Sequence, residues 1–253
     1  MNRIQQQLSV KNKILSIYFT AGFPNLNDTK SLIKELAESG VDIIEIGLPF
    51  SDPLADGPTI QSSSMQALKN GMTTVLLFEQ LEGIRDTVDI PLVIMGYFNP
   101  MLQFGMENFL KACQKTGVDG LIIPDLPLEI YLSDYKALFE SYGIEMIFLI
   151  TPQTSEERIR MIDTHTHGFI YMVSSDGVTG SKERFEKKQE QYFERIARMN
   201  LKNPQLIGFG ISNKTTFQQA TKHQKGVIIG SSFIQFISKN KADDVSDFIK
   251  NML

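Results

Sequence analysis

The chain has 253 residues, of which 42% are hydrophobic, and its 17 Phe residues support a sizeable core although there is no Trp. A formal net charge of −4 argues against a general nucleic-acid binder. Its single cysteine, Cys113, excludes an intramolecular disulfide and a cysteine-type zinc cluster, so we interpret it as a small buried hydrophobe in a reducing compartment.

The N-terminal residues 1–13 contain no uninterrupted apolar run, so they resemble neither a signal peptide nor a membrane span. We therefore expect a cytoplasmic protein without a membrane partner. No Ser/Gly tract, Pro-rich stretch or low-complexity block resembles a linker. Residues 1–253 are accordingly expected to form a single domain.

Short runs of β-branched and aromatic residues recur along the chain and predict eight strands. Segments with helical spacing separate them; residues 28–40, for example, open with Asp28 as a helix cap and close on Gly40. The strands are nearly continuous apolar runs, as expected for a parallel sheet that is covered on both faces. The predicted strands span residues 14–20, 42–48, 91–98, 120–126, 145–150, 169–174, 205–211 and 226–230.

Eight alternating units in a chain of this length indicate an α/β protein, a single-domain (β/α)8 TIM barrel. A doubly wound sheet is the alternative, because alternation alone does not show whether the sheet closes. A barrel places its chemistry at the C-terminal ends of the strands and in the loops that follow them.

The second predicted strand carries a carboxylate, Glu45, where a core residue is expected, and a Gly- and Pro-rich loop with Asp52 and Asp56 follows it. Burying an unpaired carboxylate is costly, so Glu45 indicates pairing, a raised pKa or a catalytic role. Two carboxylates in unlike settings form a plausible acid/base pair. The alternative for Glu45 is a buried salt bridge inside the barrel, and Asp52 alternatively shapes a turn.

The last two predicted strands are followed by glycines, Gly208 and Gly210 after the seventh and Gly230 with Ser231 after the eighth. In barrels these loops, with the N-terminus of a short helix, bind phosphate through backbone N–H groups. Residues 232–237 are the predicted helix. The loop 174–181 after the sixth strand is interpreted as a lid whose Thr179 offers a hydroxyl to Asp56.

The three histidines are not expected to bind a metal. His165 and His167 precede the sixth predicted strand, which places them at the N-terminal face of a barrel, and His223 lies on a late helix. Carboxylates, hydroxyls and tyrosine therefore remain as the acid/base groups, without a metal site or a Ser-His-Asp set.

Residues 45–61, EIGLPFSDPLADGPTIQ, closely resemble the signature of the tryptophan synthase alpha subunit family. The resemblance continues through residues 18–24, 96–100, 124–127, 177–180 and 208–212 and covers nearly the whole chain. It implies a lyase of L-tryptophan biosynthesis that cleaves indole-3-glycerol phosphate to indole and glyceraldehyde 3-phosphate without a bound cofactor. Glu45 would be the acid/base that serves indole C3 and the side-chain hydroxyl, and Asp56 would accept a hydrogen bond from the indole N–H.

The resemblance also assigns supporting positions, with Tyr171 and Thr179 helping the catalytic pair. A packed barrel aromatic remains the alternative for Tyr171. Ser175-Asp176 departs from the family pattern before Gly177, so the contacts of the lid with phosphate are expected to differ. The implied indole pocket is Phe19, Ile60, Tyr97 and Phe209, and the implied phosphate site is Gly180, Gly208, Gly210, Gly230 and Ser231.

The family pairs with a pyridoxal-phosphate (PLP) beta subunit as an alpha2beta2 heterotetramer, so PLP is expected in the partner, and Asp52 and Pro53 are expected to contact it. Two alternatives remain. A barrel isomerase or aldolase would share the glycine arrangement, but the predicted strands offer no Lys for a Schiff base. A barrel kept only to activate a beta subunit would not need Glu45 for catalysis.

Overall fold

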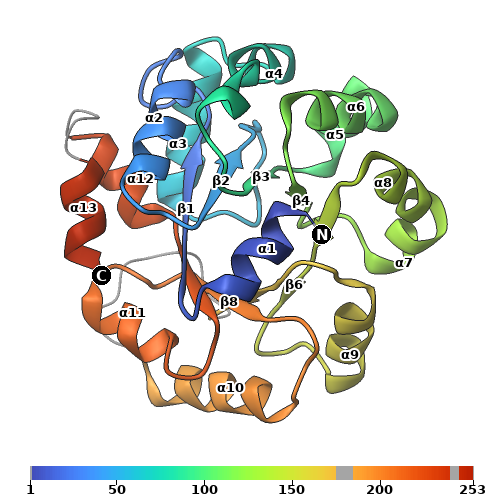
Figure 1. The fold of residues 1–253 in the computed structure, drawn as a ribbon, viewed down its shortest axis with the longest axis vertical. Helices are drawn as coiled ribbons and strands as arrows, with labels where there is room; N and C mark the ends of the chain where they lie inside the picture. Colours follow the sequence, from blue (N-terminus) through green and yellow to red (C-terminus); the bar gives the residue numbers. More distant parts are fainter. Residues whose placement is uncertain (1, 175–184, 240–244, 253) are drawn as a thin grey trace.

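The computed structural model describes residues 2–174, 185–239 and 245–252 (Figure 1). Its strands are β1 (Ile14–Thr20), β2 (Ile43–Gly47), β3 (Leu92–Met95), β4 (Gly120–Ile122), β5 (Glu145–Ile147), β6 (Leu149–Ile150), β7 (Ile170–Val173), β8 (Gln205–Gly208) and β9 (Gly226–Ile229). Its helices are α1 (Arg3–Val10), α2 (Thr29–Glu38), α3 (Pro58–Lys69), α4 (Thr74–Leu81), α5 (Phe98–Phe104), α6 (Met106–Thr116), α7 (Leu128–Ile130), α8 (Lys136–Tyr142), α9 (Glu156–His165), α10 (Lys187–Arg198), α11 (Lys214–Ala220), α12 (Ser231–Ile237) and α13 (Val245–Met252), with a 3₁₀ turn η1 (Ile84–Asp86) and a π-helical turn η2 (Tyr131–Tyr135).

The strands form one parallel sheet in the order β5-β4-β3-β2-β1-β9-β8-β7-β6. Its two ends, β5 and β6, are halves of one extended segment that is interrupted at Phe148. The first half pairs with β4 and the second with β7, and the Tyr171 amide donates to the Phe148 carbonyl at 2.9 Å. The segment 145–150 therefore closes the sheet. The predicted TIM barrel is confirmed, and the doubly wound alternative is wrong.

Helix α1 lies across the N-terminal opening of the barrel, in the centre of the ring of strands in Figure 1. Its buried residues Ile4 and Leu8 lie on one side, and Ile4 packs over Gly120 at the start of β4. Arg3 forms an ion pair with Asp119 at 3.1 Å, just ahead of the same strand. This end is thus filled, which leaves the opposite end for a site.

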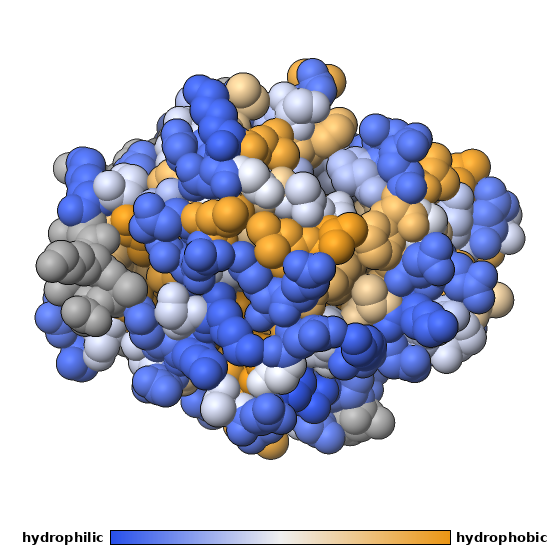
Figure 2. Space-filling model, turned by 90° about the horizontal axis from the view of Figure 1, so that it is seen from above, coloured by the Kyte–Doolittle hydropathy of each residue, from blue (hydrophilic) through white to orange (hydrophobic). Residues whose placement is uncertain are grey.

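The helices other than α1 form a ring outside the strands (Figure 1). Helix α2 lies where predicted, but the Asp28 side chain makes no hydrogen bond to the helix; it accepts one from the Asn25 amide at 3.1 Å instead. The surface at the α2 and α4 edge is largely hydrophilic with a hydrophobic band across it (Figure 2). Within the described ranges, no helix has the length and apolar character needed to span a membrane.

Candidate active site

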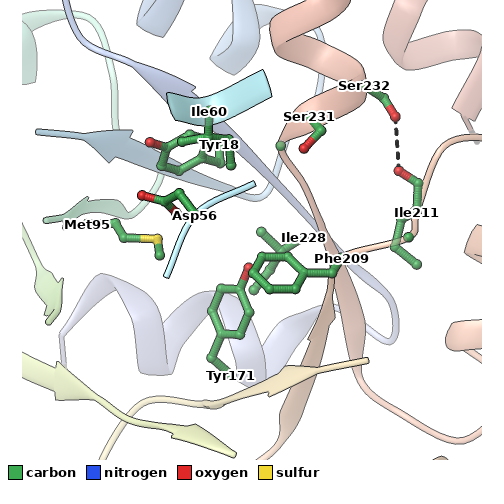
Figure 3. Close-up of a pocket in the computed structure, with 12 residues that line it drawn as sticks. Tyr18, Asp56, Ile60, Met95, Tyr171, Phe209, Ile211, Ile228, Ser231 and Ser232 are labelled. Atoms are coloured by element: carbon green, nitrogen blue, oxygen red, sulfur yellow. Dashed lines mark hydrogen bonds between the residues drawn. The ribbon is translucent and has the colours of Figure 1, made fainter. Parts of the chain in front are cut away.

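A pocket of about 460 Å³ opens at the C-terminal ends of the strands (Figure 3). A second pocket of about 270 Å³ adjoins it, because Tyr18, Asp56 and Met95 line both. Tyr97 and Pro53 line only the second. The larger pocket is lined by Tyr18, Asp56, Ile60, Met95, Tyr171, Phe209, Gly210, Ile211, Ile228, Gly230, Ser231 and Ser232.

Glu45, in the middle of β2, is fully buried and is not among the residues that line either pocket. Its Oε1 accepts a hydrogen bond of 2.7 Å from the Ser16 hydroxyl of β1, and its Oε2 has no hydrogen-bond partner among the described residues. Burial raises the pKa of Glu45 to about 8, and the Ser16 hydrogen bond opposes that rise. The buried salt bridge considered as an alternative is absent among the described residues, since no cation pairs with Glu45 there.

Asp56 lies in the loop between β2 and α3 and reaches into both pockets. Its backbone is held by a 3.0 Å hydrogen bond from its amide to the Pro53 carbonyl and by Gln61, whose side-chain amide donates to the Asp56 carbonyl at 2.8 Å. The Tyr97 hydroxyl donates to Asp56 Oδ2 at 3.2 Å. Burial raises the pKa of Asp56 to about 6, and the Tyr97 hydrogen bond limits the rise.

The two carboxyl groups therefore differ in protonation state near neutral pH. With a pKa of about 8, Glu45 is mostly protonated at pH 7. With a pKa of about 6, Asp56 is mostly ionised at the same pH. The site combines a neutral acid below the pocket floor with an anionic acceptor in its wall, which is the arrangement expected for acid/base chemistry.

Two tyrosines cross the barrel mouth, and each depends on a glycine. A Cβ on Gly47 would collide with the Tyr18 hydroxyl, and a Cβ on Gly208 would collide with that of Tyr171. Both rings are buried and both line the larger pocket. Their pKa values are raised by burial first, and the charges of Asp56 and Glu45 raise them further. Both phenols therefore stay protonated at neutral pH.

One residue predicted for the indole pocket does not line it. Phe19 is fully buried but lines neither pocket, whereas its neighbour Tyr18 lines both. The reason is the pleat of β1, in which successive side chains point to opposite faces and Tyr18 shares the Glu45 side of the strand pair with Ser16. The sequence analysis missed Tyr18. The alternating direction of successive side chains along β1 could have identified it.

Of the other three residues predicted for the indole pocket, Ile60 and Phe209 line the larger pocket and Tyr97 lines the smaller one. Tyr171, the second residue of β7, also lines the larger pocket. Its ring meets that of Phe209 edge-on at 6.2 Å, as Figure 3 shows.

The predicted phosphate residues separate into two groups. Gly210, Gly230 and Ser231 line the pocket at the end where α12 begins, and Gly210 adopts a φ of 75°, which favours glycine. Ser232 Oγ donates to the Ile211 carbonyl at 3.2 Å and ties the two loops together (Figure 3). Gly208 does not line the pocket; it makes room for the ring of Tyr171 instead.

Thr179 and Gly180, with the rest of the predicted lid from Ser175 on, lie outside the described residues. The two predicted partner contacts differ in burial, since Asp52 is exposed and Pro53 is buried. His167, through its carbonyl, accepts a 2.8 Å hydrogen bond from Gln5 of α1, which confirms its place at the N-terminal end of the barrel. No three His, Cys, Asp or Glu side chains in the described ranges are grouped to hold a metal ion.

Comparisons with known proteins identify the family of the chain. The family model described as "Tryptophan synthase alpha chain" matches residues 4–252. The tryptophan synthase alpha chain of Flavobacterium psychrophilum is 65% identical over 252 residues, covering 100% of both chains. A solved structure of tryptophan synthase subunit alpha from Legionella pneumophila is also similar to this chain.

That Legionella pneumophila structure gives a TM-score of 0.89 at 31% identity and covers 100% of this chain and 97% of its own. A Mycobacterium tuberculosis tryptophan synthase structure gives 0.90 at 27% identity, covering 99% and 96%. The chain therefore belongs to the tryptophan synthase alpha chain family, the lyases that cleave indole-3-glycerol phosphate to indole and glyceraldehyde 3-phosphate in tryptophan biosynthesis.

Proposed function

We propose that in this chain Glu45 is the acid/base of the cleavage and that Asp56 stabilises the charge that develops on the indole ring. The observation that carries the proposal is a pair of buried carboxyl groups at one barrel mouth, one neutral and one ionised near pH 7. A neutral acid and an anionic acceptor are both required, because the bond from indole C3 to the glycerol chain breaks only after C3 has gained a proton.

The steps balance with Glu45 as the only group that exchanges protons with the substrate. Neutral Glu45 donates its proton to indole C3, and the positive charge that results on the ring nitrogen is stabilised by Asp56 through the N–H. The Glu45 carboxylate then takes the proton of the adjacent side-chain hydroxyl while the C3–C bond breaks. The bond electrons return to the ring, which gives indole, and the hydroxyl carbon becomes the aldehyde of glyceraldehyde 3-phosphate.

Glu45 must reach the pocket to do this, since it lies below the lining residues in the structure. Its Oε1 is bonded to Ser16, while Oε2 has no partner among the described residues, so a single hydrogen bond holds the carboxyl in its buried position. We infer that rotation about the side-chain bonds brings the carboxyl to the substrate between Tyr18 and Tyr171.

The two ends of the pocket support a substrate with an indole ring and a phosphate group. Ile60, Met95, Tyr171 and Phe209 offer apolar surface to a flat indole ring beside Asp56. At the other end, the loop at Gly210 and the first turn of α12, with Gly230 and Ser231, would offer backbone N–H groups to the phosphate. The roles of Thr179 and Gly180 in the lid stay predictions.

For the partner, the proposal is that a PLP-containing beta subunit binds the face formed by the loops after β2, β3 and β4. Three large apolar side chains are exposed there on neighbouring barrel segments: Leu54 by 88%, Leu102 by 47% and Ile130 by 43%. Exposed Asp52 would contact the partner directly, whereas buried Pro53 would shape the loop that carries Leu54. The assembly would be the alpha2beta2 heterotetramer, with PLP in the partner.

The experiment is indole release from indole-3-glycerol phosphate by the purified chain, with and without a beta subunit. Glu45→Gln and Asp56→Asn should each lower kcat by about 100-fold or more. The matched control is Glu79→Gln on the exposed side of α4, which should not change the rate. Full activity of Glu45→Gln would refute the role of Glu45, and a chain that activates the partner without any cleavage of its own would be an effector barrel instead.

A further inference from the structure

The hydroxyl of Tyr97 makes two hydrogen bonds with consecutive residues of the loop that carries Asp56. It accepts from the Ala55 amide at 2.9 Å and donates to Asp56 Oδ2 at 3.2 Å. The ring packs against Phe50, with centroids 5.2 Å apart. Tyr97 thus contacts both the backbone and the carboxylate of the loop, which an apolar pocket wall does not need.

The residue that follows Tyr97 is bonded to the next barrel segment. It is the N-cap of α5, but its own side chain makes no hydrogen bond to the helix. The exposed Asp125, in the loop after β4, accepts a 2.9 Å hydrogen bond from the Phe98 amide, the first amide of α5. Phe98 also packs edge-on against Tyr135 at 5.5 Å. Because a capped helix end holds its first residues in place, Asp125 fixes the backbone from which the Tyr97 ring extends.

We propose that Tyr97 and Asp125 are positioning residues of the lyase: Asp125 fixes the start of α5, and Tyr97 holds the Asp56 carboxylate at the orientation that the indole N–H requires. This inference rests on the role proposed above for Asp56. It replaces the reading of Tyr97 as part of an apolar indole slot with a role that acts through the carboxylate.

The neighbours of Asp56 show whether Tyr97 acts on it through a hydrogen bond or only through charge. Tyr18 on β1 and Tyr171 on β7 face it as neutral phenols, and Glu45 on β2 is the other carboxyl nearby. Burial raises the pKa of the Tyr97 phenol most, the Asp56 charge raises it further, and the Asp125 charge adds least. Of these groups, Tyr97 alone lowers the pKa of Asp56 through a hydrogen bond. Loss of the Tyr97 hydroxyl should therefore shift the titration of Asp56 toward higher pH.

The same contacts extend to the surface on which we place the partner. Leu54, which is 88% exposed, directly precedes Ala55, whose amide bonds to Tyr97. Asp125 is exposed in the neighbouring loop. A displacement of either loop would move the Tyr97 hydroxyl relative to Asp56.

The test is Tyr97→Phe, which keeps the ring and its packing on Phe50 but removes the hydroxyl. We expect kcat for indole release to fall about tenfold at pH 7 with KM little changed, and the acid limb of the pH profile to move to higher pH. The matched control is Tyr142→Phe, because the Tyr142 hydroxyl donates to the Glu107 carboxylate at the same 3.2 Å on the surface. Tyr97→Phe with wild-type kcat and an unmoved acid limb would overturn the inference.

Two further variants keep the test independent of folding defects and of the proposed function. Asp125→Ala should lower kcat, as Tyr97→Phe does. Asp125→Asn should keep kcat close to the wild-type value, because the amide oxygen still caps α5. In an Asp56→Asn background, Tyr97→Phe should cause no further loss. Full activity of Asp56→Asn would refute the role of Asp56. If Asp56→Asn loses most of its activity and adding Tyr97→Phe lowers it further, only the positioning role would be refuted.

Discussion

Cleavage by this chain should depend on pH through two carboxyl groups whose pKa values are both raised by burial. Asp56 must be ionised, and its pKa of about 6 makes kcat/KM rise as the pH increases through that value. Glu45 must be protonated, and its pKa of about 8 makes kcat/KM fall as the pH increases beyond it. The profile should therefore be a bell with its maximum near pH 7, and kcat/KM should be about tenfold lower at pH 5 and at pH 9.

The assay is steady-state indole release across this range, with buffers at constant ionic strength. The second pKa of a phosphate group is about 6 as well, so the acid limb of the wild-type chain alone does not identify Asp56. The residual activity of Asp56→Asn separates the two, because a limb that belongs to the substrate persists in that variant and a limb that belongs to Asp56 disappears.

The basic limb is tested with Ser16→Ala. The Ser16 hydroxyl bonds to Glu45 Oε1 at 2.7 Å and lowers the pKa of Glu45 against the larger effect of burial. Removing that hydroxyl should raise the pKa of Glu45 and move the basic limb to higher pH. A flat profile between pH 5 and pH 9, or a basic limb that stays in place in Ser16→Ala, would refute the acid role of Glu45.

Three further predictions concern other parts of the molecule. Gly208→Ala should lower activity and destabilise the fold by about 1–3 kcal/mol, measured by urea unfolding, because its Cβ would displace Tyr171; an unchanged pocket in its crystal structure would contradict this. Asp119→Ala should cost about 3 kcal/mol of unfolding free energy, since it leaves the half-buried Arg85 without its 2.5 Å ion pair, and a loss below about 1 kcal/mol would show that the pair is not needed. Leu54→Ser should weaken binding of the beta subunit in titration calorimetry without changing the isolated chain's stability, and unchanged affinity would exclude Leu54 from that interface.

The strands and their order of appearance could be predicted because each is a nearly continuous apolar run between segments with helical spacing. Closure of the barrel could be inferred only from the count of such runs, and it depends on one segment, residues 145–150, that changes neighbours at Phe148. A long-range pairing of this kind leaves no local signal. Likewise, Asp28 matched a helix cap by type, but its side chain turned back to Asn25, which the pattern does not encode.

At the site, Glu45 could be proposed because a carboxylate inside an apolar strand is costly to bury, and Asp56 because it lies in the Gly- and Pro-rich loop that follows that strand. Their difference in pKa could not be predicted, since it depends on how completely each is buried and on the hydroxyls of Ser16 and Tyr97. The role of Gly208 was also inaccessible. Gly208 is needed because the ring of Tyr171, from the neighbouring strand, occupies the space of a side chain there.

The account depends most on the claim that Glu45 is a neutral acid at physiological pH. Difference infrared spectroscopy of wild type against Glu45→Gln measures this directly, through the carbonyl stretch of a protonated carboxyl group. The account predicts that the band is present at pH 7 and is lost as the pH rises through about 8. A Glu45 that is already ionised at pH 7 would contradict it, because no proton would then be available for indole C3.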